Sequence, residues 1–523
     1  LYSEKSTDSF KVIPGFTYAY WVEDAFIENF EKGFNIEQYA EFTGSQNITG
    51  NNEKYLRYHW EVEADKVGQT YWVFYAKGGD YRKYYGNLEM VIDWRDSARN
   101  FYATNKTSNL LSEHFWFREG VTYSAVTSRG TGFRYLPKGC IFDKSGPSIA
   151  IKDSLYYLLA LLNSKTAELY FRVLNPSINL QVKDIKALPI LVEDKDKIAD
   201  ITQRSVQLAK DDWDSFETSF TFKQHPLTVG HTRVEEAFVA WKATQLERYN
   251  ELLSNEATVN ELFKAIYRLD DLEIKFEERD IPIRKAILQR DIHSLISYAV
   301  GCMFGRYSLD EPGLVYAGGN WDSSKYHTYV PDGDNIIPIC DDDYFDDDIT
   351  GRFVKWVETV YGSETLEENL KFIADALGGK GTPREVIRSY FINDFYADHL
   401  KIYQKRPIYW LFDSGKKNGF KALVYMHRYQ SDLLARMRTD YVHEQQERYR
   451  TQLMHLADAI DHASASERVK LTKQQKKIQE QALEIQKYEE KVHHLADQNI
   501  QIDLDDGVKH NYELFADVLA KIK

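Results

Sequence analysis

The segment from Lys77 to Lys138 carries the residue types best suited to bind nucleic acid. It contains ten Lys or Arg residues against six Asp or Glu, a local net charge of +4 in a chain whose net charge is −14. Its first part, KGGDYRKYYGN, combines glycines with cations and aromatic rings. Glycines let backbone amides approach phosphates, and Lys and Arg supply countercharge, so we expect Arg82 and Lys83 to contact phosphates. The wider set of expected DNA-binding residues adds Lys77, Tyr84, Lys106 and Arg134.

A second part of this segment, YSAVTSRG, places hydroxyl groups beside an arginine. Arginine pairs bidentately with guanine in the major groove, and hydroxyls can contact other base edges. From composition alone, an ordinary solvated polar loop is the favoured interpretation of both parts. If the segment binds DNA, base reading is expected from Thr127, Ser128 and Arg129, with Asn179 and Gln181 as secondary contacts.

Other groups of titratable residues are weaker candidates for catalysis or metal binding. Glu273 and Lys275 follow Asp270 in a nuclease-like order, but chance is favoured because charges are dense there and no strand is expected. His455 and His462 lie seven residues apart, which is as typical of a solvated helix face as of a metal site. We expect neither a catalytic residue nor a metal site in this chain.

Eight aspartates and no Lys or Arg lie between Pro331 and Thr350. The Asp341–Asp348 run could hold Ca²⁺ or Mg²⁺, but it lacks the central glycine and terminal glutamate of an EF-hand. A solvated acidic loop is favoured. A second functional interpretation is that this loop repels DNA and orients a duplex against the basic segment.

Size and composition indicate a globular protein of several domains. A chain of 523 residues exceeds what one core usually supports, so we expect two to four domains. The three cysteines are too few and too far apart for a disulfide framework or a zinc site, and no apolar run is long enough for a membrane span. We therefore expect a cytoplasmic protein. Because the chain starts with Leu1 rather than Met, we also expect a piece of a longer one.

Hydrophobic periodicity predicts a multidomain α+β fold, with a mixed α/β region in the first half. A helix is expected at Ala25–Lys32, and one helix from Ser154 to Arg172 follows a series of short strands. The strands are expected at Tyr71–Tyr75, Met90–Trp94, Gly139–Phe142 and Ser148–Ile151.

The middle of the chain has a strongly helical pattern and is expected to form a spacer. Amphipathic periodicity gives three helices there, and Pro282 is placed in the first turn of a fourth that runs to Phe304. The first three are expected at Asp194–Ser215, Val234–Leu253 and Asn260–Arg268.

The C-terminal part is expected to be rich in helices. Thr382 and Glu385 form a capping-box pattern, and a β-hairpin is expected between Pro407 and Met426. Two long helices, Tyr429–Ala463 and Val469–Asn499, close the chain. In the second, Leu471, Ile478, Ile485, Val492 and Asn499 recur every seven residues, which predicts an antiparallel pair packed within the chain rather than a dimerising coiled coil.

Several long motifs resemble one known family. The run LNPSINLQVKDIKALPI resembles the closing motif of target-recognition domains in type I and fused restriction–modification enzymes. Together with FKVIPGFTYAYWV, KGGDYRKYYGN, IDWRDSARNF and HFWFREGVTYSAVTSRGTGFRYLPKG, it resembles the PglX adenine-specific DNA methyltransferases of type 1 BREX phage-defence systems. The resemblance continues through KRPIYWLFDSGKKNGFKALVYMHRY and DLDDGVKHNYELF, so it covers essentially the whole chain.

This resemblance implies a DNA target-recognition role. The family's catalytic domain binds S-adenosylmethionine and holds the flipped adenine with an Asn-Pro-Pro-Tyr motif, whereas no two prolines are adjacent here. The chain alone is therefore expected to be inactive and to bind no cofactor, with the catalytic domain outside it. The expected segments are a linker (1–75), a target-recognition domain (76–215), a helical spacer (216–330) and an α-rich C-terminal domain (331–523).

The expected partners follow from the same resemblance. They are double-stranded DNA, other BREX subunits and acidic phage proteins that mimic DNA, with no membrane. The alternative is a protein-interaction scaffold of the defence complex that makes only non-specific DNA contacts.

Overall fold

In the computed structural model the chain forms two compact units, each built from segments that are discontinuous in sequence. The α+β class predicted from the sequence is confirmed. Unit 1 comprises Leu1–His59, Lys66–Ser219 and Lys242–Ala286, and unit 2 comprises Trp60–Asp65, Phe220–Trp241 and Ile287–Lys523. The structure describes residues 7–15, 19–43, 46–68, 70–125, 132–175, 177 and 179–522.

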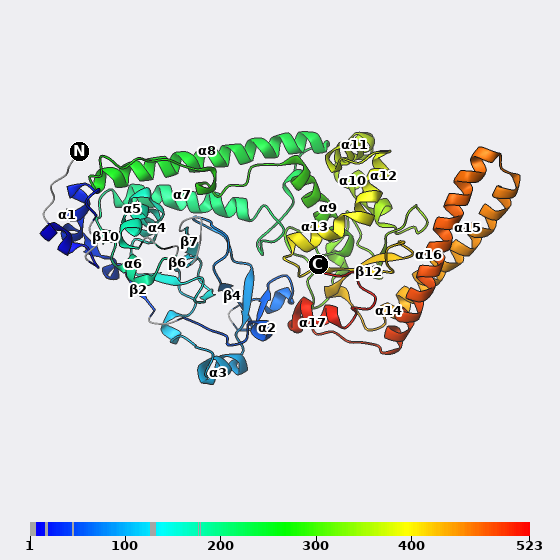
Figure 1. Cartoon of the computed structure of the whole chain (residues 1–523), viewed down its shortest axis with the longest axis horizontal. Coiled ribbons are helices and arrows are strands. Elements are labelled where there is room, and N and C mark those ends of the chain that lie inside the picture. The colour runs from blue at the N-terminus through cyan, green and yellow to red at the C-terminus, as the bar shows by residue number, and fades with distance from the viewer. Residues whose placement is uncertain are drawn as a thin grey trace. The chain divides into compact units, whose positions relative to one another are not determined.

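Unit 1 contains two four-stranded sheets and one two-stranded sheet (Figure 1). The strand orders are β2-β9-β6-β7, β3-β5-β4-β8 and β1-β10, and all pairs are antiparallel except β4 with β8. The strands are β1 (Phe34–Asn35), β2 (Ala40–Phe42), β3 (Leu56–Tyr58), β4 (Trp72–Ala76), β5 (Met90–Asp93), β6 (Gly120–Tyr123), β7 (Phe133–Leu136), β8 (Ile141–Phe142), β9 (Ser148–Ile151) and β10 (Pro189–Ile190).

The four strands predicted from the sequence are confirmed as β4, β5, β8 and β9. Strands β3, β6 and β7 were not predicted; they are as short as the confirmed β5 and β9, and at three or four residues a two-residue period does not reliably separate a strand from a loop. The main core of unit 1 combines the β2-β9-β6-β7 sheet with helices α4, α5, α7 and α8. These helices are α4 (Leu155–Asn163), α5 (Lys165–Leu174), α7 (Lys195–Trp213) and α8 (Val234–Ile266), accompanied by α1 (Asp24–Lys32), α2 (Asn52–Tyr55), α3 (Asp96–Thr104) and α6 (Val182–Lys186).

Three helix predictions between Ser154 and Phe304 differ from the structure. The single helix expected from Ser154 is two helices, because the Ser164 side chain accepts a hydrogen bond from Ala167 N and starts α5 anew. The two helices expected after Val234 are one, α8, whose middle residues Leu252 and Val259 are held in the core. The helix expected from Pro282 to Phe304 is present as α9 and ends at the predicted residue, but it begins only at Leu288, so Pro282 lies before it.

Unit 2 combines helices with one antiparallel sheet of order β11-β13-β12. The predicted hairpin is confirmed as β12 and β13, and the Thr382 capping box is confirmed at the start of α12. The strands are β11 (Ile337–Pro338), β12 (Tyr409–Asp413) and β13 (Lys421–Tyr425), and the helices before the closing pair are α9 (Leu288–Phe304), α10 (Ile349–Tyr361), α11 (Leu366–Leu377), α12 (Pro383–Asn393) and α13 (Phe395–Ile402).

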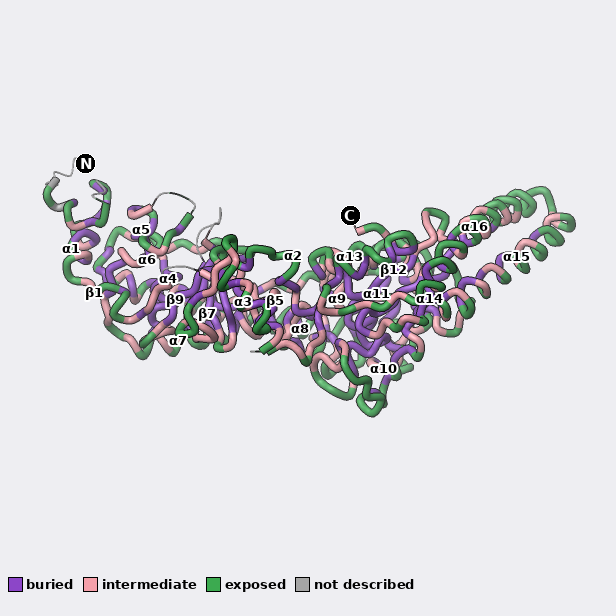
Figure 2. Tube along the Cα trace, turned by 90° about the horizontal axis from the view of Figure 1, so that it is seen from below, coloured by how far each residue is buried: buried purple, intermediate pink, exposed green. Residues whose placement is uncertain are grey.

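The predicted antiparallel helix pair is also confirmed. Helices α15 (His443–His462) and α16 (Ala465–Asp497) lie side by side in Figure 1, and a π-helical turn, Met437–Val442, joins α15 to α14 (Leu433–Arg436). Figure 2 shows that exposed residues predominate towards the far end of the pair. The heptad residues Ile478, Ile485 and Val492 are buried, and a short helix α17 (Gly507–Glu513) follows.

In the described part of the chain, no helix is both long and apolar enough to cross a membrane. All three cysteines are among the described residues; they are buried and form no disulfide with one another.

Candidate nucleic-acid interface

The segment KGGDYRKYYGN lies between β4 and β5 and begins with a tight glycine turn. Gly78 and Gly79 have φ of +82° and +111°, and a Cβ on Gly78 would lie 2.7 Å from the Ser145 carbonyl oxygen. Two hydroxyls hold the turn: Ser145 Oγ donates to Lys77 O and Ser124 Oγ to Gly79 O, both at 3.0 Å. Only glycine fits this close approach, so the backbone geometry is fixed by the sequence.

Arg82 is bound inside unit 1. Its guanidinium lies 2.7 Å from the fully buried carboxylate of Asp212 on α7, and it also donates to the carbonyl oxygens of Tyr85 and Pro282. Arg284 contacts the same carboxylate at 3.0 Å. Burial alone would raise the pKa of Asp212, but the two arginines outweigh it and hold the pKa below its usual value.

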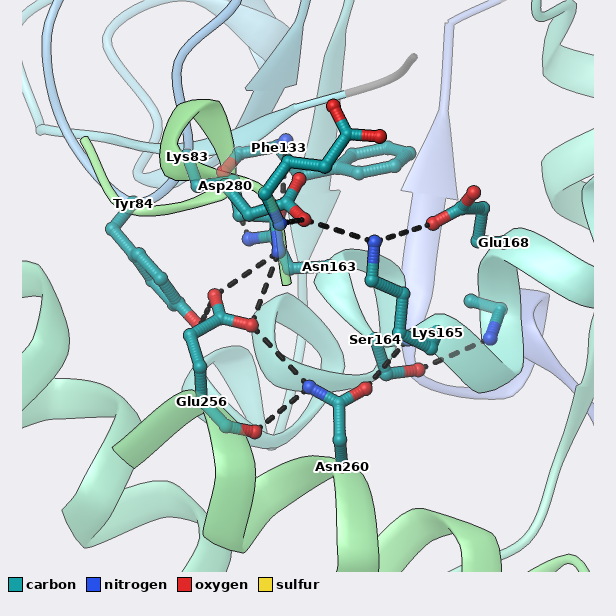
Figure 3. A network of polar contacts seen from close by, with 12 residues as sticks. Lys83, Tyr84, Phe133, Asn163, Ser164, Lys165, Glu168, Glu256, Asn260 and Asp280 are labelled. Carbon is teal, nitrogen blue, oxygen red and sulfur yellow. Dashed lines mark hydrogen bonds and ion pairs between the residues drawn. The ribbon is translucent and has the colours of Figure 1, made fainter. Parts of the chain in front are cut away.

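Lys83 and Tyr84 share one buried partner, Glu256 on α8 (Figure 3). Lys83 Nζ lies 3.1 Å from both carboxylate oxygens of Glu256, and the Tyr84 hydroxyl donates to one of them at 2.6 Å. Burial and then Glu256 itself raise the pKa of Tyr84 far above its usual value, so the phenol keeps the proton that it donates. Lys83 and Glu256 thus form a buried ion pair, and the Tyr84 hydroxyl adds a hydrogen bond to the same carboxylate.

Asn260, one turn after Glu256, extends this network (Figure 3). Its amide donates to Glu256 Oε2 at 3.3 Å, and its carbonyl oxygen accepts from the backbone N of Lys165 at 2.6 Å. Lys165 Nζ in turn lies 3.1 Å from Asp280. Burial alone would raise the pKa of Asp280, but Lys83 and further hydrogen bonds lower it. The network thereby connects Lys83, Lys165 and Asp280, which are far apart in sequence, to helix α8.

The same network reaches β7. Tyr84 donates its backbone N–H to Phe133 O at 2.9 Å, and the Asn163 side chain bonds the backbone N and O of Phe133 at 2.9 Å each (Figure 3). The next residue, Arg134, is 1% exposed, and among the described residues its guanidinium makes long hydrogen bonds to Ser124 Oγ at 3.4 Å and to Gly132 O at 3.5 Å. Burial and the nearby Arg82 lower the pKa of Arg134 to about 10.

The structure therefore divides the predicted DNA-binding residues into two sets. Arg82 and Lys83 are paired with buried carboxylates, the neutral Tyr84 hydroxyl donates to one of them, and Arg134 is buried within unit 1. Lys77 is half-buried, whereas Lys106, Asn179 and Gln181 are exposed. Thr127, Ser128 and Arg129 lie outside the described residues.

The residues that anchor this region, Asp212, Glu256 and Asp280, were not singled out from the sequence. One signal for Glu256 was present. Along α8 the buried Leu252, Val259 and Phe263 form an apolar stripe, and Glu256 falls in the same stripe at helical spacing. A carboxylate in an apolar stripe needs a buried cation, and the chain supplies Lys83.

The Asp341–Asp348 run lies in unit 2 and is largely ion-paired. Arg388 contacts Asp343 and Asp348, Arg448 contacts Asp342, and Lys477 contacts Asp341. The loop is therefore tied to α12, α15 and α16 by cations instead of being merely solvated. Among the described residues, carboxylate oxygens of Asp332, Asp334 and Asp347 lie within 4.8 Å of one another.

Two curated proteins resemble the chain over nearly its whole length, while no protein-family model matches it. The adenine-specific methyltransferase PglX of Lacticaseibacillus casei (strain Zhang) is 39% identical, and the alignment covers 98% of this chain and 45% of the relative. The adenine-specific methyltransferase BrxX of Escherichia coli O9:H4 (strain HS) is 35% identical, with coverage of 99% and 46%.

The chain is therefore homologous to a part of two adenine-specific methyltransferases. Within that class it is homologous to PglX and BrxX, which confirms the resemblance seen in its motifs. It spans less than half the length of these two relatives.

Proposed function

We propose that this chain is the DNA target-recognition part of a site-specific N6-adenine methyltransferase of a BREX phage-defence system. The S-adenosylmethionine-binding catalytic domain would lie outside it. The observation that carries the proposal is the alignment: nearly all of this chain matches less than half of each methyltransferase, and these residues contain no adjacent prolines from which an Asn-Pro-Pro-Tyr motif could be built. Base flipping and methylation would belong to the other part.

The interface proposed for DNA lies on unit 1, around the glycine turn and the β6–β7 connection. The exposed Lys106 has no carboxylate partner among the described residues, and Lys77 flanks the turn. These cations would contact phosphates, while Thr127, Ser128 and Arg129 remain sequence-based candidates for base reading, with Asn179 and Gln181 secondary. Acidic proteins that mimic DNA would compete for the same face.

The test is selection from a randomised duplex pool at low and near-physiological salt. Enrichment of a short asymmetric site that survives the higher salt would support the proposal. Binding that disappears with salt and enriches nothing would overturn it, because phosphate contacts alone are sequence-independent and salt-sensitive. A filter assay with labelled S-adenosylmethionine is expected to show no binding to this chain.

The alternative, a scaffold that docks other defence-complex subunits, is favoured by one feature of unit 2. The helix pair exposes Met454, Val469 and Leu483 by 61%, 71% and 56%. Replacing all three with Glu would abolish subunit capture if the pair is a docking surface, and would leave duplex selection unchanged.

A further inference from the structure

Unit 1 contains an open groove with a volume of about 670 Å³ that no part of the ion-pair network fills. One wall is formed by three tyrosines, Tyr85, Tyr135 and Tyr156, together with Pro137. The other is the outer face of α7. The volume lies in the range typical of sites for nucleotide-sized ligands.

The aromatic wall is built from three separate places in the sequence. The rings of Tyr135 on β7 and Tyr156 on α4 are nearly parallel, with 22° between their planes and 6.2 Å between their centroids. The Tyr135 hydroxyl donates to Glu119, which fixes the ring orientation. Lys210 Nζ lies 5.6 Å from the centroid of the Tyr85 ring. Neither Tyr135 nor Tyr156 is fully buried, so both keep surface available to a ligand.

The α7 wall supplies polar groups at helical spacing. Gln203, Gln207 and Lys210 line the groove together with the exposed Asp200, and both glutamines are exposed. The Gln207 amide donates to Asp211 at 2.6 Å, which leaves its carbonyl oxygen to accept from a ligand. Amide side chains donate and accept together, as the edge of a nucleobase requires. Arg204 and Lys210 add two cations, each paired with an exposed or partly exposed carboxylate. Such pairs are weak and can exchange for a phosphate.

We propose that this groove binds one unpaired nucleobase of a DNA strand. The base would stack on Tyr135 and Tyr156, present its edge to the glutamines of α7, and place its phosphate near Lys210. Aromatic faces beside cations are the combination by which proteins hold unpaired bases. This inference rests on the proposed DNA-binding function but concerns a site separate from the glycine turn.

The experiment uses the whole chain and a single-stranded oligonucleotide that carries one 2-aminopurine. Stacking on tyrosine is expected to quench the fluorescence of this base, and anisotropy of a labelled strand gives the affinity. Tyr135→Leu and Tyr156→Leu should each weaken binding about tenfold and remove the quenching. Tyr156→Phe keeps the ring and should behave as the wild type. Tyr20→Ala, at a tyrosine that is 67% exposed elsewhere in unit 1, is the matched control.

Equal quenching in the wild type and both Leu variants would overturn the inference, as would single-strand binding without quenching. Free dAMP distinguishes the source of the base: competition at micromolar concentration would mean that the groove takes free nucleotides and would overturn the assignment to a strand. Duplex selection by the Leu variants separates this site from the proposed function. If the Leu variants still select a duplex site but no longer quench the fluorescence, the proposed function and the groove assignment are both supported. If the wild type selects a duplex site without quenching, only the groove assignment is overturned.

Discussion

Glu256 lies 3.1 Å from Lys83 Nζ through each of its carboxylate oxygens, although 173 residues separate the two in the chain. Both side chains are almost completely buried. A pair of this kind contributes little net stability relative to apolar residues, yet neither partner can be removed alone. It links α8 to the segment after the glycine turn and so fixes that segment within unit 1.

Glu256→Gln is expected to lower the free energy of unfolding by about 3–5 kcal/mol, because the Lys83 ammonium stays buried without a countercharge. The double variant Glu256→Gln/Lys83→Met should recover much of that loss. Urea denaturation of both variants measures the difference. Two single losses that simply add in the double variant would contradict the coupling between these side chains.

Arg129→Ala is expected to reduce discrimination between the selected site and a one-base variant by about 1–3 kcal/mol. Lys106→Ala is its matched comparison. Loss of a phosphate contact should weaken binding to every duplex alike and reduce the slope of log affinity against log salt by about one. Affinities on two duplexes at three salt concentrations distinguish the cases. If Arg129→Ala lowers the affinity for both duplexes equally, the Arg129 side chain contacts the DNA phosphates and not the bases.

Acid should destabilise unit 2 below about pH 6.5. Burial lowers the pKa of His225, His399 and His427 to about 3, with Arg306 adding to the effect on the last two. Below about pH 6.5 the unfolded chain binds protons that the folded imidazoles do not, so each histidine removes up to about 1.4 kcal/mol per pH unit. Asp332 acts oppositely, because burial raises its pKa above its usual value.

Urea denaturation between pH 6.5 and 5 tests this balance. The expected net slope is about 2 kcal/mol per pH unit in the wild type, and it should be steeper in Asp332→Asn, which removes the opposing group. Replacing the exposed His455 with Asn should leave the slope unchanged. Stability that does not vary over this range would contradict the neutral buried histidines.

The helix pair of unit 2 depends on its seven-residue seam. Ile485→Ala should destabilise the chain by about 2–5 kcal/mol, because the side chain is fully buried and leaves a cavity. Leu483→Ala, two residues away on the same helix but 56% exposed, should change stability by less than about 0.5 kcal/mol. Thermal unfolding of both variants compares them. Similar effects would mean that α16 does not pack on α15.

Local patterns predicted the elements well where one face of a long segment is apolar, as in α7, α16 and the β12–β13 hairpin. They failed where a single side chain or a tertiary contact determines where a helix begins or ends. Ser164 divides one apolar run into α4 and α5, and core packing carries α8 through polar residues with poor helix propensity. Pro282 suited a helix start, but its carbonyl oxygen accepts from Arg82 in an extended stretch.

The candidate site shows a similar limit. Interleaved cations and aromatics at Arg82 and Lys83 have the composition of a phosphate-binding loop. Their carboxylate partners, Asp212 and Glu256, come from distant helices, and no local pattern reveals such a pairing. The one local signal was Glu256, a carboxylate within the apolar stripe of α8. It predicted a buried cationic partner but did not identify Lys83.

The π-helical turn Met437–Val442 determines how the following helix, α15, is rotated about its own axis. A π-turn holds one residue more than an α-turn, and each residue of an α-helix advances the direction of its side chains by about 100°. The wider π-turn takes up this additional residue within about one turn, so the Tyr449 and Leu456 side of α15 still faces the core that it shares with α16. The extra residue is therefore absorbed locally, whereas one more residue inserted into the regular part of α15 would rotate all later side chains by about 100° and break their contacts with α16.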